Sequence, residues 1–385
     1  MIEQDKAYIT DVLQRLVRID SVNPVLDPGG AGETAIAAVV AETLERLGLE
    51  VSVLESRPGR PSVVGRLRGA GEGRSLMLNA HCDTVGVTGM AEPFSAEIRD
   101  GRLYGRGAYD MKGSLAACIG AVESIVRAGV RPPGDILIAA VADEEHASLG
   151  TMEVVERYRV DGAIVTEPTS ERVCLAHKGF AWIEVVTQGR AAHGSRPELG
   201  IDANLRMGRV LGGLEALQQS LAGGEAHPLL GPASLHAAIL EGGTGLSTYA
   251  AECRLCIERR TLPGESEARV VAQVEELIDR LRLADPAFAA TVRPMLYRPA
   301  FEARSGSPLV AILAGEVERE AGKAAEFVGD SPWMDSALLA DAGADTVVFG
   351  PHGTGAHADV EWVDLASVHR TAAVLARTAL AWGKR

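Results

Sequence analysis

Three apolar segments of this sequence are each followed by side chains that can bind a metal or move a proton. The segments cover residues 75–80, 135–141 and 163–166. The polar residues that follow them are, in chain order, His81, Asp83, Glu144, Glu145 and Glu167. Short apolar runs of this kind are typical of buried strands in an α/β sheet, whose ligands bind at the carboxyl ends of the strands. We therefore expect these side chains to meet at one edge of a sheet.

Two further candidates, Asp110 and His357, lie in glycine-rich segments outside these strands. Imidazole and carboxylate groups without cysteine suit zinc or a related divalent metal. The acids outnumber the ligands that one zinc needs, whereas two metals sharing a bridging carboxylate would use them all. Adjacent Glu144 and Glu145 point in opposite directions if the backbone is extended, so that one can bind metal while the other takes a proton from water. Taken alone, His81 is better explained as a strand-end histidine next to an acid.

The elements that must position these residues divide the chain into two expected domains. At 385 residues the chain exceeds what one hydrophobic core usually supports. Residues 1–175 and 289–385 carry the helix and strand patterns of an α/β domain, with a mixed, mostly parallel sheet flanked by helices. Residues 176–288 predict strands with helices on one face, which indicates an inserted α+β domain.

Composition excludes several classes of partner. The formal charge of −14 argues against nucleic acid or an anionic membrane surface. The first residues lack the features of a signal peptide, and no apolar run reaches the length of a membrane span. Five scattered cysteines fit a reduced, cytoplasmic protein. Cys253 and Cys256 form a lone C-x-x-C within an apparent strand, where we expect both to be packing residues.

The motifs, taken in order, resemble those of the M20 metallopeptidases and deacylases. They are H-x-D at His81, D-M-K-G at Asp110, D-E-E at residues 143–145, E-P at Glu167 and G-x-G-A-H ending at His357. The family includes acetylornithine deacetylase, succinyl-diaminopimelate desuccinylase, aminoacylase-1 and carboxypeptidase G2. The resemblance covers nearly the whole chain and implies a zinc-peptidase-like catalytic domain with an inserted lid and dimerisation domain.

The resemblance also implies a role for each candidate of the metal site. It places His81, Asp110 and Glu167 on one metal, and Asp110, Glu145 and His357 on the other, so that Asp110 bridges the two ions. Glu144 would be the general base, and Asp83 would orient His81. The metals would be two divalent ions, zinc first, with cobalt or manganese as alternatives. The resemblance further implies a cis peptide bond after Asp110.

Two candidates lie in the expected lid. His193 matches the histidine that reaches the site of a neighbouring subunit and stabilises the oxyanion, which implies a homodimer formed through the lid. Arg260 matches the arginine that binds the substrate carboxylate, a task that suits a guanidinium group. Taken alone, they are better explained as a turn histidine and a strand-end ion pair. Ser247 and Ala250 stand where many members have Asn and Pro, so part of substrate recognition differs here.

These observations predict a metal-dependent amidohydrolase that removes the N-acyl group from an amino acid with a free carboxylate. Glu144 would take a proton from the attacking water and return it to the leaving amine. The alternative within the same chemistry is a dipeptidase or carboxypeptidase acting on short peptides. Two alternatives come from other classes: a non-catalytic metal-binding scaffold, against which the complete set of site residues argues, and a thiol-redox or nucleotide-binding enzyme. For the latter, the C-x-x-C and the glycine clusters lie in the wrong context.

Overall fold

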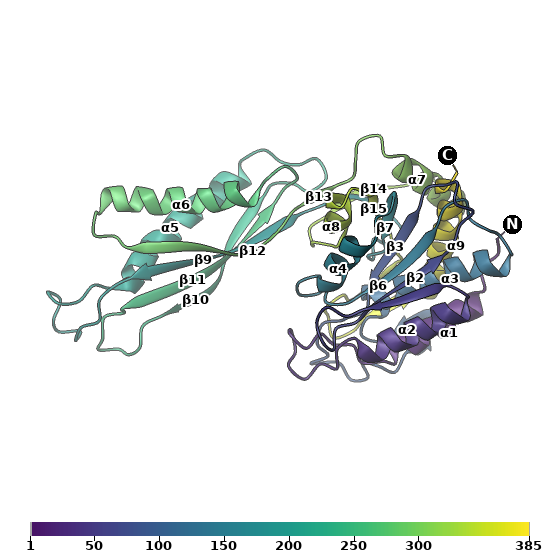
Figure 1. The fold of residues 1–385 in the computed structure, drawn as a ribbon. Helices are drawn as coiled ribbons and strands as arrows, with labels where there is room; N and C mark the ends of the chain where they lie inside the picture. Colours follow the sequence, from purple (N-terminus) through teal and green to yellow (C-terminus); the bar gives the residue numbers. More distant parts are fainter. Residues whose placement is uncertain (1, 385) are drawn as a thin grey trace. The chain divides into compact units, whose positions relative to one another are not determined.

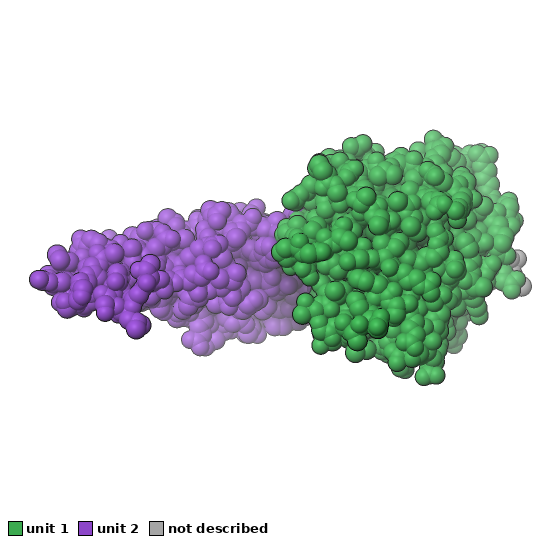
Figure 2. All heavy atoms as spheres, turned by 90° about the horizontal axis from the view of Figure 1, so that it is seen from below, with its two compact units in different colours: residues 1–175, 303–328, 334–385 green, residues 176–302, 329–333 purple. Residues whose placement is uncertain are grey.

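The computed structural model describes residues 2–384 (Figure 1). These residues form two compact units, which Figure 2 shows in different colours. Unit 1 consists of the chain up to Leu175, Ala303–Val328 and the chain from Met334 onward. Unit 2 consists of Ala176–Glu302 and Gly329–Trp333.

The main sheet of unit 1 is mixed. From one edge its order is β1 (Glu50–Leu54), β2 (Ser62–Leu67), β6 (Ile136–Val141), β3 (Leu76–His81), β7 (Gly162–Val165), β15 (Asp345–Val348), β8 (Val173–His177) and β13 (Phe301–Glu302), and β14 (Phe327–Asp330) also pairs with β8. Parallel pairs join the four central strands β6, β3, β7 and β15. The predicted α/β class is confirmed, and the strand ends predicted to carry the site belong to three of these central strands.

Helices cover both faces of this sheet (Figure 1). On one face the hydrophobic cluster contains side chains of α1 (Lys6–Val17), α2 (Thr34–Arg46), α3 (Gly113–Arg127), α7 (Pro308–Ala321) and α9 (Leu365–Trp382). Leu76, Leu78 and Ala80 of β3 belong to this cluster, so the intervening residues of β3 face the other side. On that side, α4 (Leu149–Arg157) and α8 (Ser336–Asp341) contact each other and the central strands.

A second, small sheet in unit 1 was not predicted from the sequence. Its order is β16 (Gly353–Thr354), β17 (Trp362–Asp364), β5 (Arg102–Tyr104) and β4 (Glu97–Arg99), with antiparallel neighbours. The chain leaves β5 into the loop that carries Asp110, and His357 lies between β16 and β17. This sheet therefore ties together the two loops that carry the candidates outside the main sheet.

Unit 2 has an antiparallel sheet in the order β10 (Ser234–Gly242), β11 (Glu252–Thr261), β9 (Gly179–Gln188) and β12 (Ala290–Arg298). Helices α5 (Ala203–Ala222) and α6 (Glu267–Ala284) pack against this sheet. The unit extends beyond residue 288, the C-terminal limit expected for the inserted domain, because β12 pairs along β9. Cys253 is buried in its hydrophobic cluster, as expected for a packing residue. Within residues 2–384, no helix combines the length and the apolar character needed to cross a membrane.

Candidate metal centre

The central strands of the main sheet bring the first group of candidates to one edge. His81 is the last residue of β3, Glu144 and Glu145 follow β6 in a turn, and Glu167 follows β7. Because β3 pairs in parallel with both β6 and β7, the three carboxyl ends lie side by side. The sequence-based expectation that these side chains converge is met by the geometry of the sheet.

Asp110 reaches the same place from a short irregular helical segment, Ala108–Lys112. The peptide bond between Asp110 and Met111 is cis, as the family resemblance implied. His357 lies in a loop where Gly355 has a φ of +91° and a Cβ at that position would meet the Val360 carbonyl oxygen at 1.9 Å. Only glycine can occupy that position without moving the loop that presents His357.

The two carboxylate oxygens of Asp110 face different histidines. Oδ1 lies 3.2 Å from Nε2 of His81, and Oδ2 lies 3.5 Å from Nε2 of His357. Nε2 of His81 also lies 3.7 Å from Oε1 of Glu167, and Nε2 of His357 lies 3.1 Å from Oε2 of Glu145. Asp110 thus stands between two nitrogen–carboxylate pairs, the arrangement expected of a bridging carboxylate.

Two groups of donor atoms are close enough to hold a metal ion. They are His81 with Glu144 and Glu167, and His81 with Asp110 and Glu145; within each group the ligand atoms lie within 4.8 Å of one another. These groups share His81, whereas the sets expected from the sequence share Asp110. The donor chemistry, imidazole nitrogen with carboxylate oxygen, fits zinc, manganese or cobalt ions.

The protonation of the site without metal supports this fit. Burial, followed by the charge of Glu167, raises the pKa of Glu144 well above its usual range, and burial also raises the pKa of Glu145 and of Glu167. Hydrogen bonds to Asp110 and Glu145 raise the pKa of His357 to about 10. A cluster of buried acids that retains protons in this way is a site whose electrostatics favour a cation.

Asp83 contacts His81 through its backbone. Nδ1 of His81 lies 2.9 Å from the Asp83 carbonyl oxygen and 3.7 Å from the carboxylate oxygen Oδ1. A carbonyl oxygen only accepts, so Nδ1 is the donor and Nε2 is free to face Asp110 and Glu167. The sequence-based hypothesis assigned the orientation of His81 to the Asp83 carboxylate, whereas in the structure Nδ1 of His81 donates to the Asp83 carbonyl oxygen.

The Asp83 carboxylate instead holds the turn after β6. Its Oδ1 accepts a hydrogen bond of 3.1 Å from the backbone N–H of Glu144, and its Oδ2 accepts one of 3.2 Å from that of Glu145. The side-chain amide of Asn23 donates to Oδ2 at 2.8 Å. Asp83 therefore supports both acids of the turn.

Glu361 and Arg106 support the loop of Asp110, and sequence reasoning did not identify them as site residues. Oε1 of Glu361 accepts hydrogen bonds from the backbone N–H groups of Tyr109 and Asp110, at 2.9 and 3.0 Å. Oε2 accepts one from Nη1 of Arg106 at 2.7 Å. Both side chains are buried. An acid directly before β17 and an arginine between two glycines are visible in the sequence, but their pairing over 255 positions is not.

The remaining two candidates, His193 and Arg260, lie in unit 2. His193 is exposed, and its Nδ1 lies 2.8 Å from the hydroxyl of Ser195. Arg260 is half-buried and donates from Nε to Oε1 of Glu258 at 2.8 Å, with its guanidinium 5.4 Å from the Phe180 ring centre. In unit 2 itself, each residue therefore has the local contacts of the alternative explanation, a turn histidine and a strand-end ion pair.

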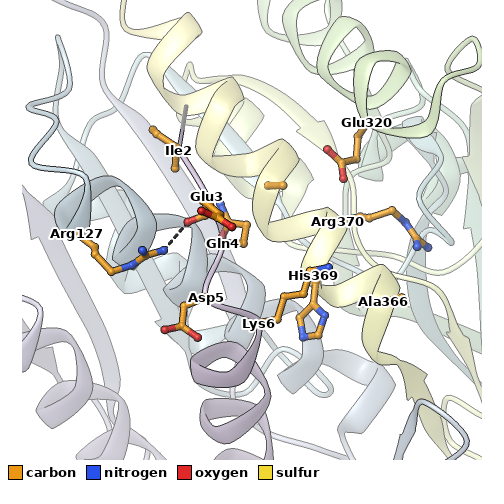
Figure 3. A pocket seen from close by; sticks show the side chains of 11 residues that line it. Ile2, Glu3, Gln4, Asp5, Lys6, Arg127, Glu320, Ala366, His369 and Arg370 are labelled. Atoms are coloured by element: carbon orange, nitrogen blue, oxygen red, sulfur yellow. Dashed lines mark hydrogen bonds between the residues drawn. The ribbon is translucent and has the colours of Figure 1, made fainter.

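A pocket on the surface of unit 1 contains none of the predicted site residues (Figure 3). It has a volume of about 940 Å³ and is lined by Ile2, Glu3, Gln4, Asp5, Lys6, Arg127, Glu320, Ala366, His369, Arg370 and Ala373. Arg127 donates to the carbonyl oxygen of Glu3 at 2.5 Å, and Arg370 pairs with Glu171 at 2.7 Å. These basic side chains are engaged by neighbouring groups, and we assign no function to the pocket.

Comparison with known proteins identifies the family. A model of the peptidase family M20/M25/M40 matches residues 77–381. N-formyl-4-amino-5-aminomethyl-2-methylpyrimidine deformylase of Bacillus subtilis is 31% identical over 360 residues, which are 84% of this chain and 83% of that protein. Acetylornithine deacetylase of Myxococcus xanthus is 31% identical over 319 residues, 80% of each protein.

Solved structures share the fold over nearly the whole chain. A tripeptidase from Staphylococcus aureus has a TM-score of 0.80 at 20% identity, covering 99% of this chain and 100% of that one. A dinuclear metal-binding peptidase of the M20 family from Bacillus subtilis has a TM-score of 0.75 at 16% identity, covering 98% and 99%. The chain is a metal-binding hydrolase of amide bonds. It belongs to the peptidase family M20/M25/M40.

Proposed function

We propose that this protein is a dinuclear-metal amidohydrolase that removes the N-acyl group from an amino acid bearing a free carboxylate. The observation that carries the proposal is the position of Asp110, whose two oxygens face His81 at 3.2 Å and His357 at 3.5 Å. In this proposal His81, Asp110 and Glu167 would hold one zinc ion, and Asp110, Glu145 and His357 would hold the other. Cobalt or manganese could occupy the same donors.

When bound, the two ions would polarise the amide carbonyl and lower the pKa of the attacking water. Glu144 takes the proton from this water and delivers it to the leaving nitrogen. Its raised pKa, caused first by burial, suits a group that must both accept and donate a proton near neutral pH. Asp83 holds the backbone of Glu144 in place through the hydrogen bond of 3.1 Å.

Arg260 supports a substrate with a carboxylate. In this proposal its guanidinium group binds the carboxylate, and His193 stabilises the negative charge that develops on the carbonyl oxygen. The function of His193 and the proposed homodimer both rest on the resemblance of unit 2 to the lid of the family. We also propose a cytoplasmic location, which is supported by the five scattered, buried and free cysteines.

The relatives favour deacylation and leave the acyl group open. One is named as a deacetylase and another as a deformylase, and the compound named in the latter contains an aminopyrimidine without a carboxylate. The alternative of a dipeptidase or carboxypeptidase remains in the proposal; the tripeptidase, at 20% identity, shows that the fold is shared and does not favour either function. If the protein removes acyl groups without needing Arg260, its substrate would resemble that of the deformylase, which has no carboxylate, more than an N-acyl amino acid.

The test is amine release from a panel of substrates, with and without a chelator. The panel contains N-acetyl, N-formyl and N-succinyl amino acids, dipeptides, and an N-formyl aminomethylpyrimidine. Chelator-sensitive release from acyl amino acids supports the proposal. Release confined to dipeptides or to the pyrimidine contradicts the proposed substrate class while leaving the metal chemistry in place.

A further inference from the structure

A buried polar network extends behind the metal centre in unit 1, and the mechanism above does not use it. Its members beyond Asp83 are Asn23, Glu33, Arg60 and Asp143. Arg60 is 6% exposed, and Asn23, Glu33 and Asp143 are each 0% exposed. Burying charged groups without partners is costly, so the hydrogen bonds within the network matter to unit 1, although Nη1 of Arg60 and Oδ2 of Asp143 have no hydrogen-bonding partner among the described residues.

Arg60 joins two of the acids. Its Nε and Nη2 donate to the two oxygens of Glu33, each at 2.6 Å, and Nη2 also donates to Oδ1 of Asp143 at 2.8 Å. The Asn23 amide donates to the same Oδ1 at 3.0 Å and to the Asp83 carboxylate at 2.8 Å. The network therefore runs without interruption from Glu33 to Asp83.

The network accepts hydrogen bonds from the backbone of the turn that carries Glu144 and Glu145. Three consecutive N–H groups each donate to a buried carboxylate oxygen: that of Asp143 to Glu33 at 3.2 Å, and those of Glu144 and Glu145 to Asp83 at 3.1 and 3.2 Å. The Asp143 backbone has a φ of +67°, an uncommon conformation for a residue other than glycine. The carboxylates hold the chain in this conformation, from which the two acids of the site project.

We propose that Arg60 is a positioning residue for the metal centre, which acts through Glu33 and Asp143 to fix the turn that places Glu144 and Glu145. The functions of these two acids rest on the proposed function above. Without the guanidinium group, Glu33 and Asp143 would face each other as buried carboxyl groups with one hydrogen-bonding partner fewer. The turn would then relax, and the positions of one metal ligand and of the general base would change together.

The charges of the network agree with this function. Burial raises the pKa of Glu33, and the hydrogen bond from Arg60 opposes that shift. The pKa of Arg60 is raised even though burial lowers it, because Glu33 and Asp143 stabilise its positive charge. Arg60 thus keeps Glu33 available as an acceptor for the backbone of Asp143.

A matched control lies on the strand that follows Arg60. Arg66, in β2, pairs with Asp135, and this pair does not contact the turn of Glu144 and Glu145. Replacing Arg66 with Met removes a less buried arginine–aspartate pair from the other end of the same strand pair, β2 and β6. It therefore measures the general effect of losing such a pair on the stability of unit 1.

The experiment compares the wild type with Arg60→Met, Arg60→Lys and Arg66→Met in the full chain. Metal-free protein is titrated with Co²⁺ and followed by visible absorption, and kcat, KM and Tm are measured separately. We expect Arg60→Met to weaken Co²⁺ binding and to lower kcat, each by about 10- to 100-fold, with KM within about twofold. Arg60→Lys keeps the charge but not the bidentate contact, so its Co²⁺ affinity and kcat should lie between those of the wild type and of Arg60→Met.

Folded Arg60→Met with Co²⁺ affinity and kcat within about twofold of the wild type would overturn the proposal. So would equal losses in Arg66→Met at an equal fall in Tm. If Arg60→Met does not fold, Arg60→Lys takes its place in the same measurements. Co²⁺ binding needs no substrate, so it tests the inference about Arg60 independently of the proposed function. A wild type that binds Co²⁺ but releases no amine would contradict the proposed function alone.

Discussion

The imidazole of His81 is held by the backbone of Asp83. Nδ1 lies 2.9 Å from the carbonyl oxygen, while the nearer carboxylate oxygen, at 3.7 Å, is beyond hydrogen-bonding distance. The carboxylate is occupied by the N–H groups of Glu144 and Glu145. Asp83 thus serves two parts of the site: its carbonyl group contacts His81 at the end of β3, and its carboxylate holds the turn after β6.

Because the carbonyl group and the carboxylate of Asp83 have different partners, the effect of Asp83→Asn can be predicted. The amide keeps the backbone contact with His81 but offers a single oxygen to two N–H groups, so the turn loses an acceptor. We expect kcat to fall about 10- to 100-fold with KM nearly unchanged. Steady-state kinetics on an N-acyl amino acid measures this.

Retention of His81 as a ligand is the control for Asp83→Asn. The Co²⁺ absorption spectrum should show that the variant still binds metal. A kcat equal to that of the wild type would show that the carboxylate does not support the turn.

The protonation of the empty site predicts that metal binding weakens as the pH falls. The pKa of His357 is raised to about 10 by its hydrogen bonds with Asp110 and Glu145, and burial raises the pKa of Glu145 and Glu167. Without metal, His357 therefore holds a proton near neutral pH, and a metal must displace it. Between pH 8 and 6 we expect the Kd for Co²⁺ to rise about tenfold for each unit of pH.

Titration of the metal-free protein with Co²⁺ at several pH values measures this dependence. His357→Ala should reduce the slope, because one displaced proton is removed. An affinity independent of pH would contradict the assigned protonation.

Much of the metal centre was accessible from the sequence because one rule connects pattern to position. Apolar runs that end in His81, Glu144 and Glu167 are strands, and parallel strands deliver their carboxyl ends to one edge. The assignment of Asp110 and His357 to the same metal site depended on the family motifs. Their positions depend on β16 and β17, strands of two and three residues that are too short to give a periodic signal.

The supporting network was not accessible for a different reason. Arg60 contacts Asp143 across 83 positions and Glu33 across 27, and nothing in the local sequence of any of them indicates the pairing. The C-terminal limit of unit 2 was also not predicted from the sequence. Strand β12 is largely exposed and contains Pro294, so its sequence lacks the alternation that marks a half-buried strand.

Arg260→Ala tests the proposed binding of a substrate carboxylate. Loss of a charged hydrogen bond of about 1.5–3 kcal/mol should lower kcat/KM for an N-acyl amino acid by about 10- to 100-fold. Arg293→Ala is the matched control, because Arg293 lies in the same sheet and pairs with Glu184.

The comparison uses each substrate and its carboxamide analogue. The variant should discriminate less between the two than the wild type does. Unchanged kcat/KM in Arg260→Ala would remove Arg260 from the site and favour a substrate without a carboxylate.

Glu361→Ala is expected to destabilise unit 1. It leaves Arg106 buried without its carboxylate and frees the N–H groups of Tyr109 and Asp110. Breaking a buried pair in this way costs about 3–5 kcal/mol in the free energy of unfolding. Denaturant unfolding measures it, and Glu361→Gln should recover part of the loss.

Glu42→Ala is the control for this prediction. Glu42 forms an exposed pair with Arg46 one turn along α2, and such pairs contribute little. If Glu361→Ala and Glu42→Ala had equal effects, the buried pair would not stabilise the loop of Asp110.

A two-metal site that hydrolyses an acyl amide is tested most directly by Co²⁺ titration of the metal-free protein, with amine release from an N-acyl amino acid as the readout. We expect activity to saturate at two equivalents of metal per chain. Glu144→Gln should bind both equivalents and release amine at least about 100-fold more slowly. Saturation at one equivalent, or full binding of two equivalents without amine release by the wild type, would contradict a two-metal hydrolytic site.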